Sequence, residues 1–156
     1  MTIGGEEEPL TVRWDLERLR AREDGGTTPL WELEGTPAPG TILRVLSALF
    51  EDGRALLLAG VRPIEAEHDA ERLAAVVVEP EGEGDEASET LISTEYDENG
   101  LPRRLGLEVY RGDEVPLRVA AGREALGDAV DGRSVVALRL ALGGIAGRGL
   151  LETIPR

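Results

Sequence analysis

The sequence contains no cysteine, no lysine and no glutamine, and its single histidine is His68. Without cysteine the chain can form no disulfide, zinc–thiolate site, iron–sulfur cluster or thiol nucleophile. Without lysine it can supply neither a Schiff base nor the lysine of a phosphate-binding loop. All 17 basic residues are arginine, and this shortage of residues with A-rich codons indicates a GC-rich genome, such as that of a high-GC bacterium.

Positive charge and long apolar runs are also scarce. The net charge is −14 and the isoelectric point is near 4.5, which disfavours binding to nucleic acid or to acidic membranes. No stretch reaches the roughly 20 apolar residues of a membrane span, and residues 1–8 lack the basic and apolar regions of a signal peptide. We therefore expect a cytoplasmic protein that binds neither nucleic acid nor membrane, with residues 1–8 as an acidic disordered tail.

Aromatic residues make up only 3% of the 156 residues, and most apolar residues are Leu, Val and Ala. A chain of this length usually forms one domain, which buries roughly 70% of the surface of the unfolded chain. We therefore expect a single domain over residues 9–156 with an aliphatic core.

Short apolar runs bounded by turn residues dominate this domain. Residues 10–16 and 28–34 alternate between apolar and polar side chains, as strands with one buried face do. Residues 41–61 predict a hairpin turning at Gly53, with both faces of its arms apolar and hence a central place in the sheet. Further strands are predicted over 90–96, 101–110, 115–121 and 134–142. The pattern predicts a mainly β fold, an antiparallel barrel or sandwich.

Helices are predicted at two places at most. Residues 64–75 follow Pro63 and bring several Ala and Leu side chains to one side, which favours a helix, although an acidic loop entering a strand at 74–78 fits equally. Residues 17–24 form either a helical turn or a frayed strand end. Residues 79–88, rich in glycine, proline and acids, are predicted to be a solvated loop.

Two segments in the second half resemble known proteins. Residues 93–108 (STEYDENGLPRRLGLE) are similar to a hairpin in lipocalin-like proteins of the carotenoid-hydratase (AttH) superfamily, and residues 143–152 (GGIAGRGLLE) resemble their glycine-rich closing strand. The resemblance implies a lipocalin-like β-barrel and, in members with two such barrels, cofactor-free hydration or cyclisation chemistry. This chain has room for one barrel, so a site between two barrels would require a homodimer. No catalytic role is transferred, because the matching residues are typical of turns and strand closure: Asp97, Gly100, Gly143 and Gly149.

The predicted strand 101–110 has one apolar and one polar face, because successive side chains alternate. Leu105, Leu107 and Val109 share the first face; Arg104, Gly106, Glu108 and Tyr110 share the second. If the polar face points into a barrel, its side chains line a ligand pocket. The alternative is an ordinary solvent-facing surface with cross-strand charge pairs. Trp14 and Trp31 suit either the core or a ligand cavity.

No metal or cofactor is expected. His68 lies among carboxylates, but no second histidine or cysteine could complete a transition-metal site with it. The acidic run 79–89 lacks the alternating ligands of a calcium-binding loop.

The leading functional hypothesis is the binding of a small hydrophobic molecule in a lipocalin-like barrel, with Trp14, Trp31, Arg104, Glu108 and Tyr110 as ligand-binding residues. A second hypothesis is a cofactor-free hydratase- or cyclase-type enzyme on the same barrel, with a buried carboxylate such as Glu108 as proton donor. A third is an acidic, chaperone-like module for protein interactions.

Overall fold

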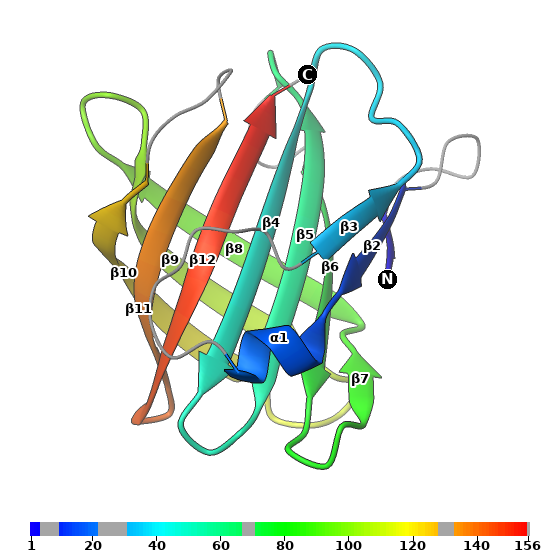
Figure 1. Cartoon of the computed structure of the whole chain (residues 1–156), viewed down its shortest axis with the longest axis vertical. Helices are drawn as coiled ribbons and strands as arrows, with labels where there is room; N and C mark the ends of the chain where they lie inside the picture. Colours follow the sequence, from blue (N-terminus) through cyan, green and yellow to red (C-terminus); the bar gives the residue numbers. More distant parts are fainter. Residues whose placement is uncertain (4–9, 22–30, 67–70, 128–132, 156) are drawn as a thin grey trace.

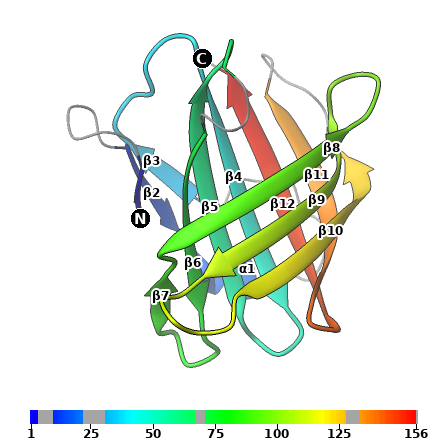
Figure 2. The same cartoon turned by 180° about the vertical axis from the view of Figure 1, so that it is seen from behind.

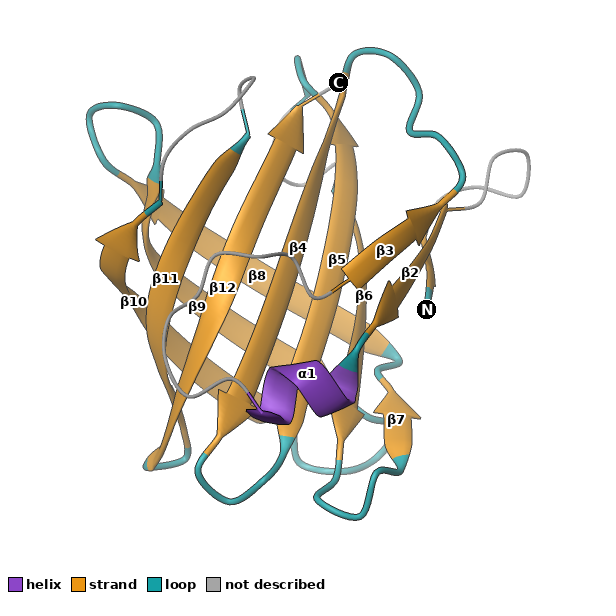
Figure 3. Ribbon diagram, in the orientation of Figure 1, coloured by secondary structure: helices purple, strands orange, loops and turns teal. Residues whose placement is uncertain are grey.

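The computed structural model describes residues 1–3, 10–21, 31–66, 71–127 and 133–155. Within these ranges the chain forms twelve strands and one short helix, α1 (Leu16–Ala21) (Figures 1 and 3). The strands are β1 (Thr2–Ile3), β2 (Leu10–Trp14), β3 (Trp31–Glu34), β4 (Thr41–Phe50), β5 (Ala55–Pro63), β6 (Arg72–Val78), β7 (Gly84–Glu86), β8 (Glu89–Tyr96), β9 (Pro102–Tyr110), β10 (Leu117–Leu126), β11 (Ser134–Leu142) and β12 (Ile145–Pro155).

Nine strands form one antiparallel sheet in the order β7-β6-β5-β4-β12-β11-β10-β9-β8. The sheet curls until β8, β9 and β10 cross the long strands β4, β5 and β12, in front of which they lie in Figure 2. Its two ends meet at the segment between β7 and β8, where the Ala87 amide donates to the Ala75 carbonyl of β6 and the Ser88 amide donates to the Tyr110 carbonyl of β9. The predicted mainly β, antiparallel barrel with at most two short helices is confirmed.

A second, three-stranded sheet of order β1-β2-β3 lies with α1 against the outer face of β4, β5 and β6 (Figure 1). Helix α1 begins after Asp15, whose side chain accepts a hydrogen bond from the Arg18 amide at 3.0 Å, a common N-terminal cap. The helix buries Leu19 against Ala55 and Leu57 of β5. Because these outer residues are covered while Leu56 and Leu58 point into the barrel, the central position predicted for the 41–61 hairpin is confirmed.

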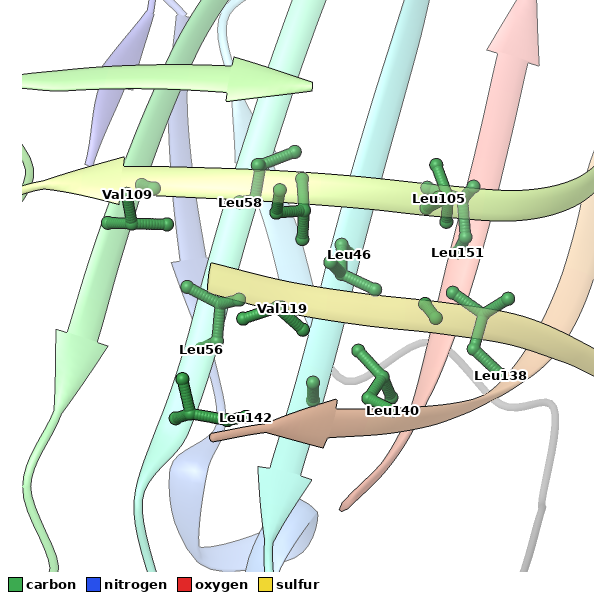
Figure 4. Packing of buried hydrophobic residues seen from close by; sticks show 14 of the residues in the cluster. Leu46, Leu56, Leu58, Leu105, Val109, Val119, Leu138, Leu140, Leu142 and Leu151 are labelled. Carbon is green, nitrogen blue, oxygen red and sulfur yellow. The ribbon is translucent and has the colours of Figure 1, made fainter. Parts of the chain in front are cut away.

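Aliphatic side chains fill the inside of the curled sheet. Figure 4 shows Leu105 and Val109 of β9 and Val119 of β10 lying over the side chains of the long strands behind them. The apolar face of the 101–110 strand is therefore the inner face. One cavity near Phe50 and Leu142, at the end of the barrel, measures about 10 Å³, at the limit for one water molecule.

Three predictions need correction. A helix over 64–75 is wrong in its described part, residues 64–66 and 71–75, since β6 begins at Arg72; over these residues the alternative of a loop entering a strand is right. The valines at 76–78 favour extended backbone, and Leu73, Ala75 and Val77 alternate into the core. The 79–88 loop contains the short strand β7, paired with β6.

The third correction concerns the chain start. Thr2–Ile3 pairs with β2 and buries Ile3, so residues 1–3 are part of a sheet. Residues 4–9 lie outside the described part of the chain. For the segment 17–24 the helical alternative is right over Leu16–Ala21.

Candidate ligand-binding pocket

A pocket of about 370 Å³ lies between β3, the segment that follows it and the ends of β4 and β12. Small-molecule sites in proteins measure about 300–1,000 Å³ and are mostly apolar. Six apolar residues line this one: Trp31, Leu33, Pro37, Leu43, Ile154 and Pro155. Among the described residues, Arg133 is the one charged side chain in the lining.

The pocket forms because side chains alternate between the two faces of each strand in two stacked sheets. In β3, Trp31 and Leu33 turn towards the main sheet, while Glu32 and Glu34 are exposed. In the main sheet, Leu43 of β4 and Ile154 of β12 are cross-strand partners on the outer face. The apolar side chains of the three-stranded sheet therefore face those of the main sheet, and the pocket lies where the two sheets diverge.

The two tryptophans join these layers. They are cross-strand partners in β2 and β3, and each indole donates to a buried side chain of the main sheet. Trp14 Nε1 donates to Ser47 Oγ at 3.0 Å, and Trp31 Nε1 donates to Glu152 Oε2. Because an indole has no other polar group, Trp31 offers only apolar surface to the pocket. Trp14 packs instead against the buried cluster of Leu19, Ala55, Leu57 and Val78 beside α1.

The polar residues predicted from β9 lie elsewhere. Arg104 is exposed, and Glu108 and Tyr110 are half-buried, all on the outer face of the curled sheet. Tyr110 donates to Glu108 at 2.7 Å, and this bond to a carboxylate raises the pKa of the Tyr110 phenol above its ordinary value. Arg118 lies 3.7 Å from Glu108. The arrangement matches the alternative of an outer face with cross-strand charge pairs, and none of the three side chains lines the pocket beside Trp31.

An ion pair inside the barrel escaped the sequence analysis. Arg44 of β4 donates to Glu71 through Nε at 2.8 Å and to Thr94 Oγ1 of β8 at 2.9 Å, and a second bond joins Arg44 to Glu71. The side chains of Arg44 and Glu71 are only 2% and 1% exposed. Gly60 makes room for the pair, because a Cβ there would lie 3.0 Å from the Glu71 carboxylate. The signal in the sequence was an arginine within the apolar run 41–50.

The residues of the two recognised segments act in turns and strand contacts, as predicted. Asp97 accepts hydrogen bonds from Arg123 and from the Leu101 and Asn99 amides, and these hold the pKa of the Asp97 carboxyl below its ordinary value. Gly100 closes this turn with φ of 77°.

Two further features bear on the expected partners. The described residues contain no group of three or more His, Asp and Glu side chains that could hold a metal ion, and His68 lies outside them. None of the described helices is long and apolar enough to cross a membrane.

Comparison with known proteins identifies the fold. No protein-family model matches the chain, and no curated protein does. Among solved structures, the chain is similar to an AttH candidate from Nitrosomonas europaea, with a TM-score of 0.55 and 16% sequence identity over 80% of this chain. The match covers 42% of that protein, so this chain spans less than half its length. At this identity the likeness is one of fold, and the fold shared with the AttH candidate is the lipocalin-like antiparallel barrel.

Proposed function

We propose that this protein binds a small hydrophobic molecule, and that the ligand lies in the pocket beside Trp31. The observation that carries the proposal is this pocket of about 370 Å³ with six apolar lining residues. The pocket lies under the three-stranded sheet, on the outer side of the main sheet, whereas the barrel interior between β4, β5, β9 and β10 holds closely packed aliphatic side chains.

The size of the pocket is consistent with micromolar affinity. A ligand that buries about 300 Å² of apolar surface gains about 7–8 kcal/mol at about 25 cal/mol per Å². A dissociation constant of 1 μM corresponds to about 8 kcal/mol, and the loss of translational freedom weakens the net affinity. We therefore expect dissociation constants in the range from about 1 to 100 μM.

The environment of Glu108 favours a binding function over the acid–base alternative. A carboxylic acid that donates a proton near neutral pH needs an enclosed, apolar site. Glu108 is 37% exposed and lies 3.7 Å from Arg118 on the outer face of the curled sheet, so it has no such enclosed surroundings.

The proposal is tested by titrating neutral apolar ligands, such as decanol and farnesol, into the protein and following tryptophan emission. We expect saturable changes in the micromolar range. Leu33→Asp places a carboxylate among the lining residues and should weaken binding at least tenfold, because the charge would have to be desolvated beside the ligand.

The matched control is Leu91→Asp, since Leu91 is an exposed leucine on β8 and does not line the pocket. This variant should bind as the wild type does. Wild-type affinity in the Leu33→Asp variant would show that the ligand binds outside this pocket. The absence of saturable binding by any apolar ligand would make the protein-interaction module the better hypothesis.

A further inference from the structure

We infer that the ligand of this pocket is an amphiphile with a carboxylate or similar anionic head, and that Arg133 binds this head. The inference rests on the proposed function and adds the chemical class of the ligand. Its starting point is the composition of the lining: six apolar residues and, within the described ranges, one cation.

Arg133 is positioned by the strand that it precedes. The register of β11 on β12 pairs Ser134 with Thr153, and one further step brings Arg133 level with Ile154, a lining residue from β12. The guanidinium therefore belongs to the edge of the pocket where the main sheet ends, while Trp31 and Leu33 cover it from β3. A cation at one edge of an apolar pocket matches a molecule with an apolar chain and an anionic head.

Arg133 is also available for a ligand. It is exposed, and it makes no hydrogen bond or ion pair within the described part of the chain. Three other exposed arginines are engaged within the chain: Arg13 bonds to Glu34, Arg103 to Glu95 and Arg139 to Glu124. A free guanidinium can form two parallel hydrogen bonds to a carboxylate, which gives both strength and orientation.

Because the net charge is −14, a preference for an anionic head group is expected at this pocket and not elsewhere on the protein. Away from Arg133, the protein as a whole repels anions and attracts cations. At physiological ionic strength such effects decay over about 8 Å, so only a nearby cation can reverse the preference. Within the described ranges, Glu152 is the one carboxylate with a hydrogen bond to a lining residue, and it is buried and accepts the Trp31 hydrogen bond.

The test compares decanoate, decanol and decylamine, three ligands with the same chain and different heads, at pH 8. Dissociation constants are measured by tryptophan emission and by titration calorimetry. In the wild type, decanoate should bind about tenfold more tightly than decanol, and decylamine should bind least well. Arg133→Met should remove the preference for decanoate while leaving the affinity for decanol within about twofold, because the methionine keeps an apolar stem. Raising the salt concentration should reduce the preference in the wild type.

The matched control is Arg139→Met, which removes an exposed arginine from the outer face of β11 away from the pocket. This variant should keep the preference for decanoate. Equal binding of decanoate and decanol by the wild type, or a preference that survives Arg133→Met, would overturn the inference and leave the proposed function standing. If none of the three ligands bound, both would fail.

Discussion

Replacing Glu71 by alanine should lower the free energy of unfolding by about 3–5 kcal/mol. The substitution leaves the Arg44 guanidinium inside the barrel, 2% exposed, without the carboxylate that compensates its charge. Thr94 would remain as a neutral hydrogen-bond acceptor at 2.9 Å, which does not replace an ion pair. Urea denaturation at neutral pH measures the loss directly, because the midpoint falls while the slope stays constant.

Two controls distinguish the effect of leaving a buried charge unpaired from the effect of removing any charged residue. Glu34→Ala breaks the ion pair between Glu34 and Arg13, whose side chains are 57% and 66% exposed respectively. It should lower the free energy of unfolding by at most about 1 kcal/mol. The double variant Arg44→Met/Glu71→Leu removes both buried charges and should recover stability to within about 1 kcal/mol of the wild type, because apolar residues of similar volume replace a buried pair well. A loss in Glu71→Ala no larger than that in Glu34→Ala would contradict this account of the barrel interior.

The local elements of this fold could be predicted from the sequence because their causes are local. The hairpin of β4 and β5 turns at Gly53, whose φ is 90°, and two apolar runs on either side leave the chain few alternatives. The alternation along β9 likewise placed Leu105, Leu107 and Val109 on one face. The same alternation does not say which face looks inward. The apolar face prevails because its burial removes apolar surface from water, whereas Arg104 and Glu108 would need partners inside.

The pocket could not be predicted because its parts meet only through long-range pairing. Leu43 and Ile154 become neighbours when β12 pairs with β4, and Trp31 reaches them through a separate sheet. The order of the strands in the sheet cannot be read from the spacing of residues in the sequence. The burial of Arg44 could have been predicted, because a charged residue in a strand with both faces covered must be buried and must have a partner.

Replacing Gly149 by alanine should cost about 1–3 kcal/mol of stability, although the change adds a single methyl group. Gly149 lies in β12 opposite Ala48 of β4. A Cβ built on it would lie 2.5 Å from the Ser47 carbonyl oxygen and 3.0 Å from the Ala48 Cβ. Both neighbours belong to β4, so β4 and β12 must move apart. A glycine at such a position permits the close approach of two backbones in a curled sheet.

The matched control is Gly122→Ala in β10, where an added Cβ would meet no atom within 4 Å. This variant should be as stable as the wild type or slightly more stable, because alanine reduces the freedom of the unfolded chain. Thermal unfolding distinguishes the two: at about 2–4 °C per kcal/mol for a domain of this size, Gly149→Ala should melt about 2–12 °C lower. Equal melting temperatures for the two variants would show that β12 can move away from β4 without loss. The close contact at Gly149 would then contribute nothing measurable to stability.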